Sequence, residues 1–225
     1  MYKHVIKPIL FLLTPDFTHK LTVFCGRVAQ ALPPARWVIR RLWSFQDTSL
    51  CQDVNGVTFH NPIGLSAGFD KNVQLSPLME DVGFGFASGG SVTLEPRKGN
   101  LRPWFHRLPK TKSVVVHAGM PNYGLGKISR YIRLNRRRLD NMPTVVSVAV
   151  VANKTTCERM GTRLTKEAII DDVKKATEYI SDNKLANVVE INISCPNAGK
   201  EPFIEAEPLD ALLTALDSVP RDVPF

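Results

Sequence analysis

The sequence lacks several features that would define its class at once. No apolar run approaches the ~20 residues that a membrane-spanning helix needs, since Lys7 and Pro8 interrupt the first one, "VIKPILFLL". The cysteines, at positions 25, 51, 157 and 195, form no C-x-x-C pair, which argues against a zinc site and a disulfide framework. The histidines, at 4, 19, 60, 106 and 117, show no ligand spacing, so we assign no metal. These absences favour a globular protein of a reducing compartment.

Positive charge is concentrated at the N-terminus. The formal net charge is +8, and residues 1–45 carry seven basic residues against one acidic residue, Asp16. Two short apolar runs accompany these charges and contain Ile9, Leu10, Leu13, Leu21, Phe24 and Val28. Short basic, apolar helices bind anionic membrane surfaces, so we expect residues 1–45 to form a helical segment in peripheral contact with a membrane. The alternative is a helical pair packed on the protein's own body. A nucleic-acid partner is disfavoured, because few polar side chains here could contact bases.

The remaining residues, 46–225, alternate between predicted strands and helices. Apolar strands are predicted at 63–68, 84–93, 144–152 and 187–194. Helices are predicted at 73–83, 127–140, 165–182 and from about Pro208 onward, with Gly83 ending the first and Thr165 capping the third. A long loop is expected through residue 125, and the final "RDVPF" is typical of the approach to another strand. Apolar strands separated by helices indicate parallel β/α units, so the predicted fold class is α/β.

Each predicted strand ends in a short polar or glycine-containing stretch. These stretches are "AGFDKN", "GGSVTLEPRKGN", "ANK" and "SCPN". The carboxyl ends of parallel strands meet at one edge of a sheet, where ligands collect. The Gly-Phe-Asp-Lys-Asn turn would bring backbone N–H groups and a cation to that edge, which suits a planar or anionic ligand. A solvated loop lysine is the alternative.

Three stretches together resemble the dihydroorotate dehydrogenases, which are FMN-dependent (β/α)8 barrels. They are "NPIGLSAGFDKN" (61–72), "GFGFASGGSVTLEPRKGNLRPWFHRLP" (83–109) and "EINISCPNAG" (190–199). The N-terminal "TPDFTHKLT" (14–22) is similar to the helical extension of the membrane-associated, quinone-using class. The resemblance implies a TIM-barrel type of fold of which about the first half is present, since a complete barrel takes ~250 residues. The family has further flavin contacts on later strands, so we expect a missing C-terminal half or a second chain to complete the barrel.

The resemblance also implies which residues form the site. Ala67, Gly68 and Lys71 correspond to the FMN cradle, with Lys71 between the flavin and the substrate, and Ser91 corresponds to a small hydroxyl residue near the flavin. Asn192 corresponds to a side chain that contacts both flavin and substrate. The substrate-binding residues implied are Lys71, Asn192, Asn197 and, through their backbone, Gly119 and Met120. A buried Asn at a strand end can also be a turn former with satisfied hydrogen bonds.

Cys195 corresponds to the base that removes a proton from C5 of the substrate. Quinone-using members usually have serine here, and cysteine is typical of the soluble class. A free thiol, with a pKa of ~8.5, is a better unassisted base than a serine hydroxyl, although an unpaired cysteine is often only a small buried hydrophobe. Two further departures are Val116 and Ala149, which stand where the family has asparagines that contact orotate and flavin. The loss of each polar partner should cost roughly 1–3 kcal/mol.

The resemblance implies FMN-dependent oxidation of dihydroorotate to orotate in pyrimidine (UMP) biosynthesis, with electrons passed to a membrane quinone. The expected location is the cytoplasmic face of a bacterial inner membrane, or the mitochondrial inner membrane. Two alternatives stay open. One is a degenerate relative that acts as a binding or regulatory module, which Val116, Ala149 and the missing half favour. The other resembles the tRNA dihydrouridine synthases, which also place Asn and Cys-Pro at a strand end but do not share the "GFDKN" turn.

Overall fold

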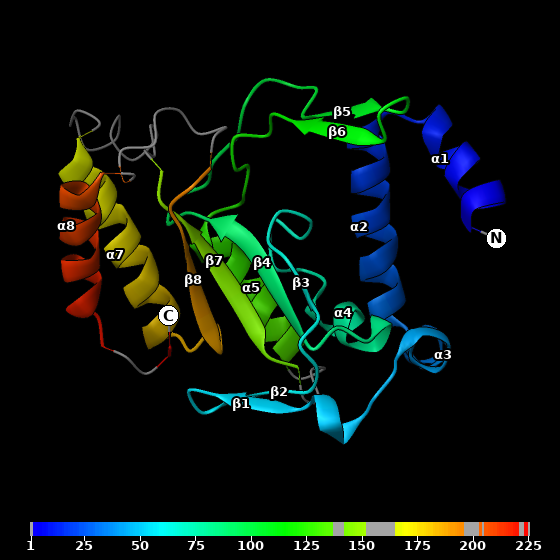
Figure 1. The fold of residues 1–225 in the computed structure, drawn as a ribbon, viewed down its shortest axis with the longest axis horizontal. Coiled ribbons are helices and arrows are strands. Elements are labelled where there is room, and N and C mark those ends of the chain that lie inside the picture. Colours follow the sequence, from blue (N-terminus) through cyan, green and yellow to red (C-terminus); the bar gives the residue numbers. More distant parts are fainter. Residues whose placement is uncertain are drawn as a thin grey trace.

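The computed structural model describes residues 2–136, 142–151, 165–195, 203, 205–220 and 223–224. Its centre is a four-stranded parallel sheet with the strand order β3-β4-β7-β8 (Figure 1). The strands are β3 (Gly64–Leu65), β4 (Phe86–Val92), β7 (Thr144–Ala149) and β8 (Val188–Asn192). All four lie inside the predicted strand ranges, which confirms the α/β class. Within the described residues the sheet is open and does not close into a barrel.

Helices cover this sheet because its strands are apolar on both sides. β7 is buried along its whole length, as expected for a central parallel strand. α5 (Leu125–Arg136), α7 (Lys166–Asp182) and α8 (Ala206–Asp217) contribute to the larger core together with β4 and β7. This core includes Val92, Ile128, Val146, Val148, Val173, Ile180 and Leu212. α4 (Ser76–Val82) contributes to a second, smaller core beside it.

Two predicted helix boundaries are confirmed by their capping geometry. The Thr165 side chain accepts a hydrogen bond from the N–H of Ala168 at 3.2 Å and caps α7. Gly83 has a φ of 100°, so it ends α4 in the left-handed conformation that favours glycine. The helix predicted from residue 127 begins slightly earlier, at Leu125.

The predicted N-terminal helical segment is present. A π-helical turn (Tyr2–Ile6) leads into α1 (Lys7–Leu12), α2 (Pro15–Ala31) and α3 (Pro33–Trp43). The Thr14 side chain caps α2 and accepts from the N–H of Phe17, and proline occupies the first turn of each of the three helices. α2 and α3 lie on the side of the molecule opposite α7 and α8 (Figure 1). No helix in the described ranges is long and apolar enough to cross a membrane.

Two antiparallel hairpins flank the parallel sheet. β1 (Gln52–Val54) and β2 (Val57–Phe59) follow a short 3-10 turn (Thr48–Leu50) and are joined by Asn55-Gly56, a pair typical of tight hairpin turns. β5 (Phe105–Leu108) and β6 (Ser113–Val116) form the second hairpin. The prediction of a continuous loop through residue 125 is therefore wrong for this hairpin. Both strands are only four residues long and neither is buried, so the one apolar signal, the three valines of β6, is too short to distinguish a strand from a loop.

Within the C-terminal "RDVPF" stretch, the described residue Pro224 lies beside β8, the outer strand of the described sheet. The N–H of Val189 donates to the carbonyl oxygen of Pro224 at 2.9 Å. Since β8 is the last strand of the sheet, this bond adds a backbone partner at its outer edge. The contact agrees with the prediction that this stretch approaches a further strand position.

The ion cluster between α3 and α4 generates a first prediction. Asp81 is fully buried, with Arg36 at 2.5 Å and Arg40 at 2.8 Å. We expect Asp81→Asn to lower the free energy of unfolding by about 1.5–3 kcal/mol, because the negative charge and one of the two acceptor oxygens that bind Arg36 and Arg40 are lost. Urea denaturation measures the change. The control Asp53→Asn, at an exposed carboxylate in β1, should change stability by less than about 0.5 kcal/mol, and equal losses in both variants would contradict the assignment.

Candidate active site

A cavity of ≈ 460 Å³ lies at the carboxyl ends of β3, β4 and β8 and is bounded by residues of the β5–β6 hairpin. This is the edge of a parallel sheet where ligands are expected. The predicted site residues that line it are Ala67, Gly68, Lys71, Ser91, Gly119, Met120, Asn192 and Cys195. The structure thus brings together every predicted site residue except Asn197, which lies outside the described residues.

Two glycines form a backbone cradle on one side of this cavity. The N–H of Gly68 donates to the Gly90 carbonyl at 2.9 Å, and the N–H of Gly90 donates to the Asp70 carbonyl at 2.8 Å. Both have positive φ angles, 108° and 124°. A Cβ added at Gly68 would meet nothing within 4 Å, whereas one at Gly90 would lie 2.6 Å from the Ser147 carbonyl oxygen. The loop is therefore joined to β4 and leaves open space beside Gly68 for a flat group.

Polar side chains from three adjacent strands, β4, β7 and β8, are linked by hydrogen bonds beside this cavity. The Asn192 amide nitrogen donates to Ser91 Oγ at 2.8 Å, and Ser91 Oγ lies 2.9 Å from Ser147 Oγ. The Asn192 oxygen accepts from the N–H of Ser194 at 3.2 Å. Ala149, where the family resemblance places an asparagine, pairs with Asn192 in register and is buried. The Asn192 amide is held in one orientation, while position 149 adds no polar group.

Lys71 places a cation at the cavity wall. Its Nζ donates to the Gly68 carbonyl and lies 5.1 Å from the centre of the Phe105 ring. Burial lowers the pKa of Lys71, and the carboxylates of Asp70 and Asp16 oppose that shift. Burial in turn raises the pKa of Asp70, against hydrogen bonds from the N–H groups of Gln74, Leu75 and Asn72. The loop thus combines a desolvated cation with a carboxylate turned into the protein.

Cys195 lines the cavity just beyond β8 and is half-buried. Arg97 lies close enough to interact with it: burial lowers the pKa of the Arg97 guanidinium, and the charge of Cys195 opposes that shift. Arg97 Nε also donates to the carbonyl oxygen of Gly119 at 2.8 Å. The sequence reasoning did not identify Arg97, although it lies in the "GGSVTLEPRKGN" stretch that follows the second predicted strand.

His19, from α2, is a second site residue that the sequence reasoning missed. Its ring lies 5.5 Å from the rings of both Phe69 and Phe105, measured between centroids. The pKa of His19 is lowered from 6.5 to about 4, first by burial and then by the positive charge of Lys71, while Asp16 opposes the shift. His19 is therefore neutral at pH 7. Its position inside "TPDFTHKLT" was the available signal, since that stretch carries the resemblance of the helical extension.

The wall opposite the strand ends is apolar. It is formed by Phe105, Val116, Ala118 and Met120. Val116 is the residue that stands where the family resemblance places an orotate-binding asparagine, so the structure puts this departure inside the cavity. A ligand here meets polar groups and a cation on one side and hydrocarbon on the other.

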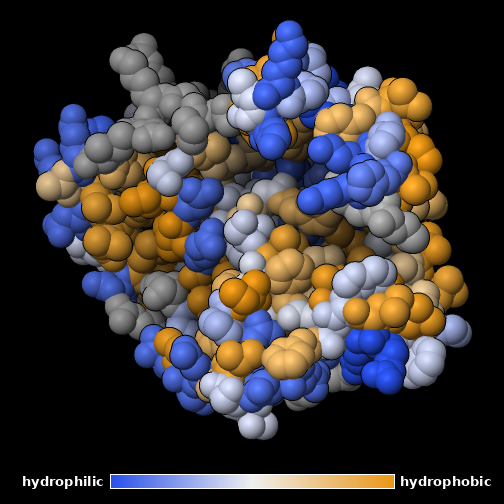
Figure 2. Space-filling view, turned by 45° about the vertical axis from the view of Figure 1, so that its right-hand side comes forward, coloured by the Kyte–Doolittle hydropathy of each residue, from blue (hydrophilic) through white to orange (hydrophobic). Residues whose placement is uncertain are grey.

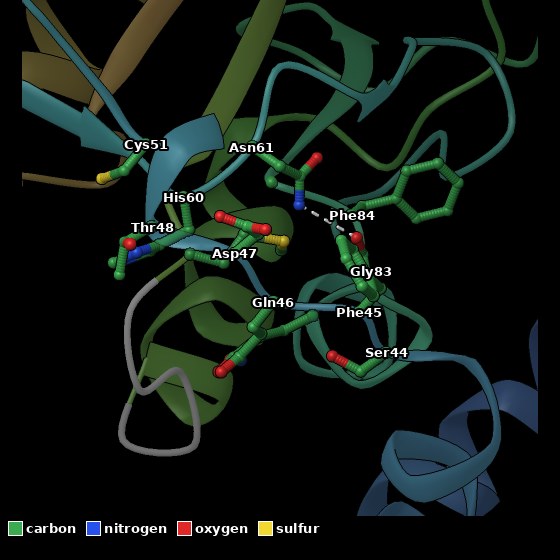
Figure 3. A pocket seen from close by; sticks show the side chains of 13 residues that line it. Ser44, Phe45, Gln46, Asp47, Thr48, Cys51, His60, Asn61, Gly83 and Phe84 are labelled. Carbon is green, nitrogen blue, oxygen red and sulfur yellow. Dashed lines mark hydrogen bonds between the residues drawn. The ribbon is translucent and has the colours of Figure 1, made fainter.

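A larger cavity, of ≈ 560 Å³, lies near the amino ends of β3 and β4 (Figure 3). Its lining includes Asp47, Cys51, His60 and Asn61, and the Asn61 amide nitrogen donates to the Gly83 carbonyl at 3.1 Å. No predicted site residue lines it. In parallel β/α folds the active site lies at the carboxyl ends of the strands. The larger cavity lies at the opposite ends, so its size does not make it the active site.

The low pKa of His19 generates a second prediction. The folded value of about 4 lies below the ordinary 6.5. Between these values the unfolded chain binds a proton that the folded chain does not, so stability falls as the pH is lowered through this window. We expect His19→Gln to reduce that fall, as measured by urea denaturation at pH values across the window. An NMR titration of the His19 ring with a midpoint near 6.5 would contradict the assignment.

Comparisons with known proteins identify the family. The family model "Dihydroorotate dehydrogenase" matches residues 49–224. Two similar proteins carry the name dihydroorotate dehydrogenase (quinone). The one from Deinococcus deserti is 35% identical over 218 residues, covering 96% of this chain and 56% of the relative. The one from Corynebacterium glutamicum (strain ATCC 13032) is 31% identical over 209 residues, covering 92% and 52%.

A solved structure shows the same similarity in three dimensions. A crystal structure of DHODH from Eimeria tenella in complex with ferulenol superimposes with a TM-score of 0.70 at 25% identity, covering 91% of this chain and 50% of that one. The chain therefore spans about half the length of the curated relatives that it matches. Since the family model matches most of the chain and relatives of more than 30% identity cover over nine tenths of it, the chain belongs to the dihydroorotate dehydrogenase family.

Proposed function

We propose that the protein acts in the FMN-dependent oxidation of dihydroorotate to orotate in pyrimidine biosynthesis, with a quinone as the electron acceptor. The observation that carries this proposal is the gathering of Lys71, Asn192 and Cys195, from separate strand ends, around one cavity. The names of the relatives support the reaction and the acceptor.

The cavity has features that suit a flavin. The open space beside Gly68 would accommodate a flat ring, and the Ser91 and Asn192 side chains would provide polar contacts. Lys71 would offset negative charge on the ring. When bound, FMN supplies hydride acceptance. We assign Ala67, Gly68, Lys71, Ser91 and Asn192 to its binding.

Cys195 is the residue that we assign to proton abstraction. It lines the cavity just beyond β8, where a thiol can accept a proton from a bound ring. Lys71 and Asn192, with the backbone of Gly119 and Met120, would orient a polar ring against this sulfur. The proton would leave substrate carbon for Cys195 Sγ, without need of a relay partner.

The N-terminal segment supports a peripheral membrane location for electron transfer to quinone. Side chains on α1, α2 and α3 expose large apolar groups to solvent, including Leu12, Phe17, Phe24, Trp37, Leu42 and Trp43. In Figure 2 the right-hand side of Figure 1, where α2 and α3 lie, comes forward, and hydrophobic surface lies beside hydrophilic surface there. These groups occur beside basic residues, a combination that binds anionic lipid interfaces. His19 would then connect the segment to the cavity from within α2.

A binding module without catalysis is the second candidate function. It is favoured by Val116, which presents hydrocarbon to the cavity where a hydrogen-bonding amide would be expected. In that case a ring could bind without being oriented for proton transfer. The two candidates differ in the behaviour of bound flavin when dihydroorotate is added.

Cys195→Ala tests the assigned base. We expect the variant to retain flavin but to lose about 10²–10⁴-fold in the rate of flavin reduction by dihydroorotate, the range for removal of a general base. Stopped-flow bleaching of the flavin absorbance measures this rate, and Cys51→Ala, at an exposed cysteine outside the cavity, is the matched control. A full rate in Cys195→Ala would refute the role. Purification of a colourless parent protein, with no flavin taken up on titration, would refute the cofactor assignment.

Substitution of exposed tryptophans tests membrane contact. Trp37 and Trp43 on α3 are 69% and 61% exposed. The double variant Trp37→Gln, Trp43→Gln should bind anionic vesicles at least about tenfold more weakly, because two large apolar groups no longer enter the interface. Co-sedimentation measures the bound fraction. Leu134→Gln, at a similarly exposed leucine on α5, is the control; equal binding by all three proteins would rule out α3 as the contact.

A further inference from the structure

A second cavity adjoins the candidate active site on the side of α2. It has a volume of ≈ 510 Å³ and lies between α2 and residues 96–104 and 121–123. The two cavities share His19, Phe69, Lys71 and Pro121. Apart from Arg97, which lies near Cys195, no residue beyond these shared ones has a role in the proposed dehydrogenase reaction. We refer to this second cavity as the basic cavity.

The lining of the basic cavity is strongly positive. Its cationic residues are Lys20, Arg27, Lys71, Arg97, Lys98 and Arg102. Asp70 is the one carboxylate among the described lining residues, and its oxygens accept backbone hydrogen bonds within the protein. The local charge is therefore far from balanced, and an anion would relieve the mutual repulsion of the cations.

Two of these cations, Arg27 and Arg102, lie over aromatic rings. The Arg27 guanidinium lies 5.5 Å from the centre of the Tyr131 ring, and that of Arg102 lies 3.9 Å from the centre of the Trp104 ring. Arg102 has one carboxylate neighbour, Asp16, at 3.4 Å. Lys20, Arg27 and Lys98 have no carboxylate partner in the described part of the chain. The cation–π contacts hold Arg27 and Arg102 in place, and Arg27 keeps its charge available to a ligand.

The spacing of residues on α2 directs two of these cations to the same wall. Lys20, Phe24 and Arg27 lie four and three residues apart, so they share one face of the helix. All three line the basic cavity. The face thus presents a cation, an aromatic ring and a second cation in sequence along the groove.

The positive charge extends to the boundary between the two cavities. There the pKa of His19 is lowered by burial and by the charges of Lys71 and Arg102, while Asp16 opposes the shift.

We propose that the basic cavity binds a phosphate group carried by a molecule with an apolar portion. A phosphate offers several strong acceptor oxygens and up to two negative charges, and arginine and lysine are its usual protein partners. The volume lies in the range of small-molecule sites. Phe24, Phe69, Trp104 and Tyr123 provide hydrocarbon and aromatic surface for the remainder of the ligand. An anionic phospholipid headgroup and a soluble phosphate ester share this chemistry.

The exposed apolar residues of α2 favour the phospholipid as the source. Phe17, Phe24 and Val28 on this helix are exposed, and Phe24 also lines the basic cavity. A headgroup in the cavity would leave its acyl chains beside these side chains. A soluble phosphate ester is the alternative ligand, and the binding experiment distinguishes the two.

Binding measurements on the purified chain test the proposal without any flavin assay. Inorganic phosphate and glycerol 3-phosphate are titrated by calorimetry, and phosphatidylcholine vesicles with and without phosphatidylglycerol are used in co-sedimentation. The test variant is Arg27→Gln, Lys98→Gln. The control is Lys110→Gln, Arg130→Gln, which removes the same charge from exposed positions outside both the lining and the N-terminal segment.

The expected result is that the test variant weakens binding of at least one probe by on the order of tenfold or more, whereas the control does not. Selective loss of the soluble probes identifies a phosphate ester as the ligand class, and selective loss of phosphatidylglycerol vesicles identifies a lipid headgroup. Absence of binding to every probe would overturn the proposal. So would an equal effect of test and control variants, which indicates nonspecific attraction by net charge. Circular dichroism confirms that both variants are folded.

Discussion

The buried carboxylate of Asp70 holds together the elements on which both cavities depend. Its Oδ2 accepts from the N–H groups of Gln74 at 2.6 Å and Leu75 at 2.7 Å, at the start of α4. Its backbone carbonyl accepts from the N–H of Gly90 in β4. One residue therefore fixes the loop after β3 to both the next helix and the next strand. Burial raises the pKa of Asp70 against these bonds, which is the cost of placing the acceptor inside the protein.

The same arrangement determines which groups of the loop face the two cavities. Because Asp70 turns inward, the next residue, Lys71, turns toward the cavities. The same loop places Gly68 with open space beside it. The cation and the cradle are thus two results of one local backbone conformation, and a change at Asp70 would disturb them together.

The N-terminal segment is part of the site because the β5–β6 hairpin is bonded to it. Asp16, in the first turn of α2, accepts from the backbone N–H groups of Trp104 and Phe105. Arg107 donates to the carbonyl oxygens of Leu10 and Leu13. These bonds join the beginning of α2 to the hairpin that bounds the candidate active site. The segment therefore supplies His19 to the cavity as well as apolar surface to solvent.

Much of the fold could be predicted because local signals agreed with it. The apolar run over β7 predicted a buried strand, and Gly83 and Thr165 marked helix ends through capping chemistry that acts within a few residues. The β5–β6 hairpin was missed because its two strands are short and not buried, and the valines of β6 alone do not distinguish a strand from a loop. In the candidate site, Lys71 and Cys195 were found through motifs, whereas His19 and Arg97 enter through contacts between segments far apart in the sequence.

The replacement at Val116 shifts the forces that act on a ligand in the candidate active site. An amide at that position could hydrogen-bond a neutral or an anionic ring, and its absence costs either ligand roughly 1–3 kcal/mol. Lys71 and Arg97 act differently, because their charge attracts an anion but gives a neutral ring much less. A hydrogen bond to a charged group contributes about 1.5–3 kcal/mol, so one such contact offsets the missing amide for an anionic ligand only. Because the missing amide costs both ligands alike, the preference for an anion comes from these cations and not from position 116. Under the proposed function it favours a carboxylate-bearing pyrimidine over an uncharged one.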